Sequence, residues 1–394
     1  MGKLREATLK YSYNDVMVEP AILSTIEHRA ECNPFDENGM LPLFTAPMDS
    51  VVNLNNFELF EKNGIIPILP RTEKIEDRKS FALKGKWAAF SLDEFEYWFT
   101  GKIILSATSN SVITALIDIA NGHVAKLYNI VRRAKSVYGD RIIIMVGNIA
   151  NPETYRVCVE SKVDYVRCSI GTGAGCITCS NTSIGYPIAS LISEIKEIKD
   201  ELVERGASKS NLTKIVADGG IRNYSDIIKA LALGADYVMV GSVFSRMLES
   251  AAVKVMERGN SKKIKLRFPL ERYTDICYKD ECWYARYTDA FIKEMSEKGR
   301  EIKNNEERPI GGIYAKFYGM ASKAGQIAMK GKKVHTSEGI EKTLPVTYTM
   351  ATWVENFIDY LRSAMSYTNS RTLYELREAN VVLVSQNTYN SINK

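Results

Sequence analysis

The chain has 394 residues, of which 45% are hydrophobic and 25% charged, so we expect a packed core in one large domain or two. Its net charge of +5 is too small an excess to indicate a nucleic-acid-binding protein. We find neither a run of about 18 apolar residues that would predict a membrane span nor the apolar core of a signal peptide in residues 1–16. The seven widely spread cysteines are therefore expected to be reduced thiols in the cytoplasm.

Short β-rich runs alternate with helical patterns from about residue 40 to 245. The runs are apolar throughout, as parallel strands are when both faces of their sheet are covered. Strand, loop and helix repeated about eight times predict an α/β fold, a (β/α)8 TIM barrel; a doubly wound open sheet is the alternative. We predict strands at 41–48, 64–70, 86–92, 115–120, 141–150, 163–171, 214–221 and 235–243, and helices at 123–139, 153–161, 188–206 and 224–234.

The alternation stops after Glu249. Residues 250–312 are charged and rich in aromatic side chains, which predicts an insertion on the barrel. An insertion in this fold serves as a lid or an oligomer contact, and a plain surface excursion is the alternative. It holds two Arg-Tyr pairs, at 272–273 and 286–287. The barrel domain is expected to comprise residues 1–249 and 313–394, with a barrel element at 313–322, a helix at 353–367 and a last short strand before a polar end.

A cysteine stands inside a glycine-rich turn, GTGAGCITC, at residues 171–179. Glycines allow close approach of the backbone to a ligand, and a thiol held there is a candidate nucleophile. Cys176 is therefore either a catalytic residue or a small residue in a tight turn. Together with Cys179 it forms a C-x-x-C motif, which is found in redox pairs and in zinc sites.

Two further glycine turns follow later strands, ADGGIRN at 217–223 and GSVFS at 241–245. Two successive turns of this kind late in a barrel commonly form a phosphate site. Asp218 is placed to accept hydrogen bonds from sugar hydroxyls, or else to cap the next helix. A phosphate site and a nucleophilic cysteine on one face indicate a phosphorylated substrate that is attacked by sulfur.

These segments together resemble the family of IMP dehydrogenase and GMP reductase. The similarity spans about residues 8–249 and 313–390, without the regulatory module that many IMP dehydrogenases carry. The matching segments are YSYNDVMVEP (11–20), LFTAPMDSV (43–51), IDIANGH (117–123), MVGNIANPETY (145–155), GTGAGCITCSNTSIGYP (171–187), ADGGIRNYSDIIKALALGADYVMVGS (217–242), FYGMAS (317–322) and SEGI (337–340).

The resemblance implies a covalent mechanism in which Cys176 attacks C2 of a purine nucleoside monophosphate and Thr178 handles water or ammonia. A reductase would convert GMP with NADPH to IMP and ammonia, and a dehydrogenase would convert IMP, NAD and water to XMP and NADH. The other implied sites are the phosphate (Gly219, Gly220, Gly241, Ser242), the ribose (Asp218), the phosphate or base (Met48, Tyr318, Gly319, Met320, Glu338), the nicotinamide (Asp118, Asn121) and the reacting carbon (Asn148).

The family often binds potassium at this loop, where the carbonyls of Gly171, Gly173 and Cys176 would be hard oxygen ligands. It also implies a homotetramer. Met48, Met320 and Tyr318 have a plain alternative as packed core residues.

The direction of the reaction is predicted from details of these motifs. Ala-Asn-Gly at 120–122, FYGMAS and a short segment after Ser322 favour GMP reductase. Ala174, Lys323 and Arg71 depart from the pattern of the family: Ala174 replaces a serine, Lys323 a proton-relaying glutamate, and Arg71 a histidine or lysine. We therefore predict a GMP reductase; the alternatives are an IMP dehydrogenase with a rearranged flap and a purine-nucleotide-binding protein that has lost turnover.

Overall fold

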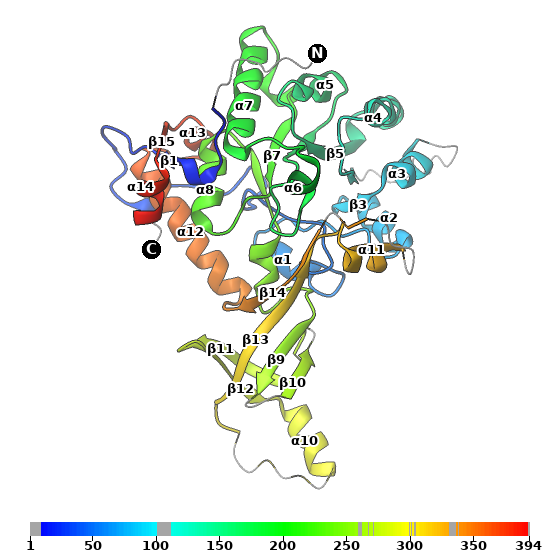
Figure 1. Ribbon diagram of the computed structural model, residues 1–394, viewed down its shortest axis with the longest axis vertical. Coiled ribbons are helices and arrows are strands. Elements are labelled where there is room, and N and C mark those ends of the chain that lie inside the picture. The colour runs from blue at the N-terminus through cyan, green and yellow to red at the C-terminus, as the bar shows by residue number, and fades with distance from the viewer. Residues whose placement is uncertain are drawn as a thin grey trace.

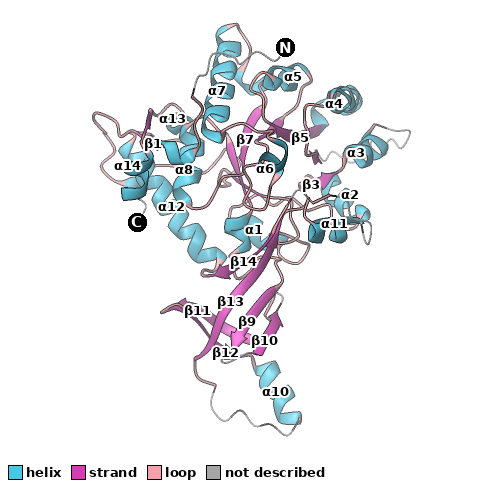
Figure 2. Ribbon diagram, viewed as in Figure 1, coloured by secondary structure: helices cyan, strands magenta, loops and turns pink. Residues whose placement is uncertain are grey.

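The protein consists of a curled parallel sheet surrounded by helices and a second, antiparallel sheet that extends away from it (Figure 1). Figure 2 shows the helices gathered around the first sheet, whereas only α10 (Asp289–Glu297) accompanies the far end of the second. The computed structural model describes residues 9–100, 112–258, 262–266, 268–270, 272–298, 300, 302, 305–330, 336–337 and 339–392.

The first sheet has seven parallel strands in the order β2-β8-β7-β6-β5-β4-β3. Their residues are almost all buried, because helices cover one face and the side chains of the sheet fill the other. The strands are β2 (Leu43–Thr45), β3 (Ala88–Phe90), β4 (Ile113–Asp118), β5 (Ile142–Ile149), β6 (Tyr165–Cys168), β7 (Lys214–Asp218) and β8 (Tyr237–Val240). Seven predicted strands are thus confirmed, and the α/β class with them: six have tighter bounds, and β4 begins and ends two residues earlier than predicted.

The run predicted as a strand at 64–70 lies between the two edge strands of this sheet. Ile66 forms a parallel bridge with Phe44 of β2, and Leu69 forms one with Ala88 of β3. Pro67 and Pro70 lack the N–H that a continuous ladder needs. The segment therefore makes isolated bridges instead of the predicted regular strand.

Large side chains fill the interior of the curled sheet. The rings of Phe44, Trp87, Tyr165 and Tyr237 contact one another with centroids 5.1–5.9 Å apart, mostly edge to face. Met145, Val216 and Met239 continue this cluster toward the carboxyl ends of the strands. The interior is a packed core, so a site must lie at a rim of the sheet, and the glycine turns follow the carboxyl ends of the strands.

The helices pack their apolar faces against the outside of this sheet. In α4, for example, Leu127, Val131 and Ala134 are fully buried while the polar residues between them face out. The predicted helices at 123–139, 153–161, 188–206, 224–234 and 353–367 are confirmed. The helices around this sheet are α1 (Phe57–Lys62), α2 (Ile75–Leu83), α3 (Leu92–Phe99), α4 (Ala125–Tyr138), α5 (Thr154–Glu160), α6 (Thr178–Thr182), α7 (Ile188–Glu204), α8 (Tyr224–Ala232), α9 (Ser242–Ser245), α11 (Lys323–Lys330) and α12 (Met350–Tyr367).

The second sheet is antiparallel and six-stranded, in the order β10-β9-β13-β12-β11 with β14 paired to β13. Its strands are β9 (Lys254–Arg258), β10 (Lys262–Leu266), β11 (Tyr273–Lys279), β12 (Cys282–Tyr287), β13 (Arg308–Tyr318) and β14 (Glu341–Val346). One face carries a small core that includes Trp283, Ala285, Ile310 and Ile313. Asp280 and Glu281, both with positive φ, form the tight turn between β11 and β12.

The segment 313–322 differs from its prediction. It was expected to resume the parallel barrel, but it belongs to β13, which begins at Arg308 and pairs antiparallel with β9, β12 and β14. The predicted domain boundary at residue 312 falls inside this strand. Neither Arg272 nor Arg286 lies at either cavity described below, and Arg286 instead pairs with Asp275 at 3.7 Å on β11.

The two ends of the described chain meet beside α8. Here β1 (Val16–Val18) pairs antiparallel with β15 (Val381–Leu383), near α13 (Leu373–Leu376). The predicted polar end forms a further helix, α14 (Gln386–Ile392). Among the described residues, we find no helix with the length and hydropathy to cross a bilayer.

Candidate active site

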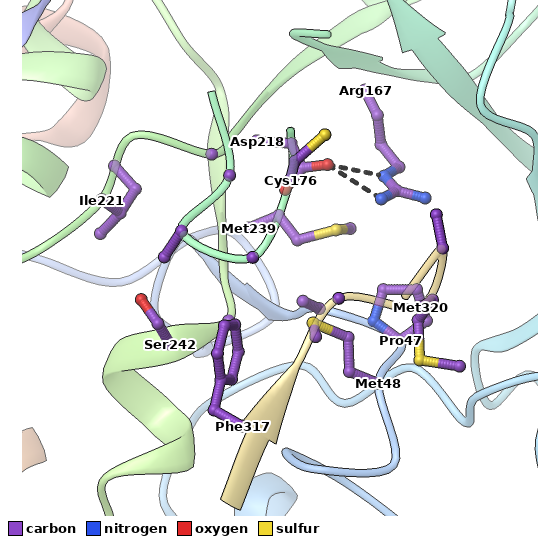
Figure 3. Close-up of a pocket in the computed structure, with 18 of the residues that line it drawn as sticks. Pro47, Met48, Arg167, Cys176, Asp218, Ile221, Met239, Ser242, Phe317 and Met320 are labelled. Atoms are coloured by element: carbon purple, nitrogen blue, oxygen red, sulfur yellow. Dashed lines mark hydrogen bonds and ion pairs between the residues drawn. The ribbon is translucent and has the colours of Figure 1, made fainter. Parts of the chain in front are cut away.

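Two cavities meet at Cys176, above the carboxyl ends of the parallel strands. The smaller has a volume of about 220 Å³ and lies between the glycine turns after β6, β7 and β8 (Figure 3). The larger, of about 480 Å³, extends toward α6 and α11. Both cavities are lined by Asp118, Gly173, Cys176, Asp218, Gly219, Met320 and Ala321. A thiol between two cavities can contact one ligand while facing another.

The loop that carries Cys176 is folded tightly upon itself and upon the turn after β7. The Cys176 N–H donates to the Gly173 carbonyl at 2.9 Å, which closes the turn before the thiol. Gly171 has φ of +82° and Gly219 has φ of +94°, a conformation that glycine adopts without strain. A Cβ on Gly219 would lie only 2.5 Å from the Thr172 hydroxyl oxygen. The two turns can approach this closely only because glycines stand there.

The base of the second sheet holds this loop from the other side. Cys176 forms an antiparallel bridge with Gly339, and the Ile340 N–H donates to the Gly175 carbonyl at 3.0 Å. A Cβ on Gly175 would lie 2.8 Å from the Gly319 nitrogen. Three glycines from three segments therefore pack backbone against backbone, and the segments that end β13 and precede β14 position the cysteine loop.

The thiol of Cys176 has a hydroxyl neighbour on α6. It is half-buried and donates a hydrogen bond to the Thr178 hydroxyl oxygen at 3.2 Å. Thr178 is the first residue of α6 and lines the larger cavity. The arrangement places a group that can accept and donate protons beside a nucleophile.

A buried arginine ties together the two aspartates of the site. Arg167 on β6 donates to Asp118 at 2.7 Å and to Asp218 at 2.8 Å, and the second ion pair is visible in Figure 3. The side-chain amide of Asn148 donates to the same Asp218 oxygen at 2.7 Å. Burial lowers the pKa of Arg167, but the carboxylates of Asp218 and Asp118 outweigh it and raise the pKa above its usual value. Both carboxylates are thus held in fixed orientations.

Arg71 adds a second guanidinium on the side of the larger cavity. Its Nη1 lies 3.3 Å from the Asp118 carbonyl oxygen and 3.7 Å from a carboxylate oxygen of Asp118. Among the described residues that line this cavity, it is the only lysine or arginine. The chemistry in this cavity would therefore take place next to one partly exposed positive charge.

The structure brings most of the predicted site residues together. Those lining one or both cavities are Met48, Asp118, Asn148, Gly171, Gly173, Cys176, Thr178, Asp218, Gly219, Gly220, Gly241, Ser242, Gly319 and Met320. Asp218 is not a helix cap, because Asn223 caps α8. Asn121 is exposed and lies outside the lining residues, where its side chain accepts from the His123 N–H. Glu338 lies outside the described residues.

Tyr318 lies next to the site without lining it. Its hydroxyl donates to Asp49 at 2.5 Å, and it is the preceding residue, Phe317, whose ring lines the smaller cavity. The other carboxylate oxygen of Asp49 is buried without a hydrogen-bond partner, and burial raises the pKa of Asp49. Tyr318 thus contacts the loop after β2 and positions β13 against it.

Two groups of this site are absent from the sequence-based prediction. The more important is Arg167. The sequence feature that could have revealed it is a lone arginine within the apolar strand YVRC. A charged residue in a buried parallel strand needs a partner. Asp49 is the other, since its contact with Tyr318 joins positions 269 residues apart.

Fold and site together define an α/β protein in which glycine turns and a thiol meet at the carboxyl ends of parallel strands. The IMP dehydrogenase / GMP reductase domain matches residues 100–267 of the chain. A GMP reductase of Staphylococcus carnosus is 31% identical over 252 residues, which cover 61% of this chain and 72% of that protein. One of Shouchella clausii is 30% identical over 262 residues (63% and 74%), and one of Buchnera aphidicola subsp. Schizaphis graminum is 27% identical over 314 residues (76% and 83%). The chain belongs to the IMP dehydrogenase / GMP reductase family, as its motifs predict.

Proposed function

We propose that the protein is a purine nucleotide oxidoreductase that acts at C2 of a purine nucleoside monophosphate through a covalent bond to Cys176, in the direction of GMP reductase. The reaction is GMP, NADPH and a proton to IMP, NADP⁺ and ammonia. The observation that carries this proposal is the half-buried thiol at the junction of two cavities. One cavity would hold the nucleotide and the other the nicotinamide, so both would reach the same carbon.

The smaller cavity suits a nucleoside monophosphate. Gly219 and Gly241 present backbone N–H groups, and Ser242 adds a hydroxyl, which together suit a phosphate. Gly220 lines the same cavity, but its N–H donates to the Thr172 carbonyl at 3.1 Å and so braces the turn. Asp218, held by Arg167, can accept hydrogen bonds from ribose hydroxyls. The purine would lie among the apolar side chains of Met48, Phe317 and Met320.

The larger cavity fits a nicotinamide next to the thiol. It combines polar groups on Asn148 and Thr178 with apolar side chains such as Ile170 and Met329. NADPH would supply the hydride to C2. The nicotinamide sites assigned to Asp118 and Asn121, like the choice of NADPH over NADH, stay predictions.

Cys176 would add to C2 of GMP, and the bond from C2 to the exocyclic amine would then break. Once the hydride has reached C2, the C2–S bond would break, which releases IMP and the free thiol. Thr178 is the group next to the thiol, so it would transfer the proton to the departing ammonia. Arg71 would balance negative charge that develops on the substrate beside it. Lys323 stands where the family has a proton-relaying glutamate, but it is exposed and lines neither cavity. We therefore assign the proton relay in this chain to Thr178.

Three further features belong to the same proposal. The segment 64–70, bridged to β2 and β3, would be the eighth strand and complete a (β/α)8 barrel. A potassium ion would be held by the carbonyls of Gly171, Gly173 and Cys176; the Gly173 oxygen already accepts one hydrogen bond and keeps a second lone pair. A homotetramer in the cytoplasm is what the family implies.

The test is absorbance at the nicotinamide band, run with GMP and NADPH and separately with IMP, NAD and potassium. Loss of absorbance in the first assay alone supports the reductase. Gain in the second alone would replace it by an IMP dehydrogenase. If the absorbance changes in neither assay although the nucleotide still binds, the protein is a purine-nucleotide-binding protein without turnover. Cys176→Ala is the control in each assay, and Cys282→Ser, a thiol of the second sheet, is its matched variant.

A further inference from the structure

The C-x-x-C motif of Cys176 and Cys179 has a second cysteine that the proposed reaction does not use. Cys179 lies in the first turn of α6, three residues after Cys176. Only Ile177 and Thr178 separate the two cysteines, which is the spacing of the C-x-x-C motifs that form reversible disulfides in redox proteins. The motif therefore brings a second sulfur near the candidate nucleophile.

The Cys179 sulfur fits into a gap within the glycine-rich loop. The Cys179 thiol contacts the carbonyl oxygens of Ile184 at 2.9 Å and Ile170 at 3.2 Å. A Cβ on Gly171 would lie 2.0 Å from the sulfur, and a Cβ on Gly185 would lie 2.1 Å from it. Two glycines thus form a gap that the Cys179 sulfur fills. Its single S–H is shared between the two carbonyl oxygens, a weak interaction that the sulfur can give up.

The other cysteines do not share this placement. Cys32, Cys158 and Cys168 are buried, and Cys277 and Cys282 lie on the hairpin of the second sheet. Among the described residues, no group of three or more histidine, cysteine or acidic side chains is arranged to hold a metal ion. Within the described residues, the pair thus lacks the further ligands that a zinc site needs.

We propose that Cys176 and Cys179 are a reversible modification site, at which a peroxide converts the two thiols to a disulfide and so withdraws the nucleophile. The consequence for turnover rests on the proposed function, whereas the disulfide itself does not. The Cys176 thiolate attacks the peroxide O–O bond, which gives a sulfenic acid and hydroxide. The Cys179 sulfur then attacks the Cys176 sulfur, the S–O bond breaks, and water leaves with the Cys179 proton. Two thiols are oxidised and one peroxide is reduced.

The surroundings assign the two roles. Cys176 faces both cavities, so a small oxidant reaches it first. Burial and the neighbouring Cys176 raise the pKa of Cys179, which makes it the poorer initial target. Cys179 is thus the resolving thiol, and Cys176 is the one that is attacked.

The test treats the whole protein with hydrogen peroxide, denatures it, digests it with trypsin with and without prior alkylation, and analyses the peptides by mass spectrometry. The tryptic peptide 168–196 carries Cys168, Cys176 and Cys179. In the reduced protein it should take an alkyl group on each cysteine. After peroxide it should be about 2 Da lighter before alkylation and take a group on Cys168 alone, and dithiothreitol should reverse this. A peptide that still alkylates at Cys176 and Cys179 overturns the proposal, whether or not the protein turns over nucleotide.

Cys179→Ser supplies the second measurement. It should keep the basal activity, and peroxide should leave a sulfenic acid on Cys176 that dimedone labels. Excess peroxide should then oxidise Cys176 of this variant further, to the sulfinic acid. Dithiothreitol should therefore restore the activity of the wild type and of the control Cys282→Ser, but not that of Cys179→Ser. Equal recovery of Cys179→Ser would overturn the protective role. A wild type without turnover that still forms the disulfide would count against the proposed function only.

Discussion

The two sheets of this protein contribute to the site in different ways. The parallel sheet supplies chemistry: Arg167, Asp118 and Asp218 stand at the carboxyl ends of its strands, and Cys176 follows β6. The antiparallel sheet shapes the cavity. It reaches the site through the backbone around Gly319 and Gly339 and through the side chains of Phe317 and Met320. Substitutions in the first sheet should therefore abolish activity or folding, whereas those in the second should shift the geometry of the site.

The largest effect is expected at the thiol. Cys176→Ala should lower the rate of nicotinamide oxidation by about 10³-fold or more, since no other group can form the covalent bond. Nucleotide binding should be retained, because the turn at Gly219 and Gly220 is untouched. The rate and the dissociation constant of GMP would be measured side by side. Residual activity within tenfold of wild type would refute covalent catalysis at this residue.

The next effect compares one arginine from each sheet. Arg167→Met leaves two half-buried carboxylates without the buried guanidinium that joins them, with only Arg71 remaining near Asp118. It should cost about 3–5 kcal/mol of unfolding free energy. Arg286→Met on β12 removes an exposed pair with Asp275 and should change it by about 0.5 kcal/mol or less. Urea denaturation of both variants measures the difference. Equal stabilities would mean that the network around Asp118 and Asp218 is not an internal brace.

A third effect arises where the two sheets join. Lys254, the first residue of β9, is fully buried and donates to the Ser250 carbonyl at 2.5 Å, with Glu249 nearby. Burial lowers the pKa of Lys254 to about 7. Between pH 7 and the ordinary lysine pKa the folded state therefore binds fewer protons than the unfolded state, and stability should rise with pH over this window, by about 4 kcal/mol at most.

The measurement is thermal unfolding between pH 7 and 10. Lys254→Met should be more stable than the wild type at pH 7 and should lose most of the rise. Burial also raises the pKa of Glu249, whose carboxylate is the charge nearby that opposes the loss of the Lys254 proton. A wild type whose stability falls from pH 7 to 9 would show that Lys254 stays charged in the folded protein.

The smallest effect tests whether the second sheet sets the geometry of the site. Gly319→Ala would place a Cβ 2.5 Å from the Gly175 carbonyl oxygen and push the cysteine loop away. A displacement of about 1 Å costs about 100-fold in rate, while the unfolding temperature should change little. Lys316→Ala, an exposed position on β13 just before Gly319, is the matched control. If both variants keep full activity, the second sheet does not position Cys176.

Much of the parallel sheet was predictable, because apolar runs between glycine turns have few other interpretations. The segment 64–70 shows the limit: its pattern is that of a strand, but two prolines reduce it to single bridges. The segment 313–322 shows another, since a short apolar run does not reveal whether its partners are parallel or antiparallel.

The site follows the same division. Cys176, Thr178 and the glycine turns are local features with a chemistry of their own, and they do lie together. The role of Arg167 could not be predicted, because its partners Asp118 and Asp218 are 49 and 51 residues away in the sequence. The support from Gly339 was equally hidden, because a glycine alone gives no sign of the loop against which it packs.

The contact of Gly175, Gly319 and Gly339 also constrains how this protein can evolve. A Cβ on any of the three would lie 2.5–2.9 Å from a backbone atom of one of the other two, closer than a side chain can come without moving the backbone. No single replacement can tighten this contact, and every one can only loosen it. The strands and hairpins beyond it are free to diverge in length and sequence, while the three glycines must be inherited as a set.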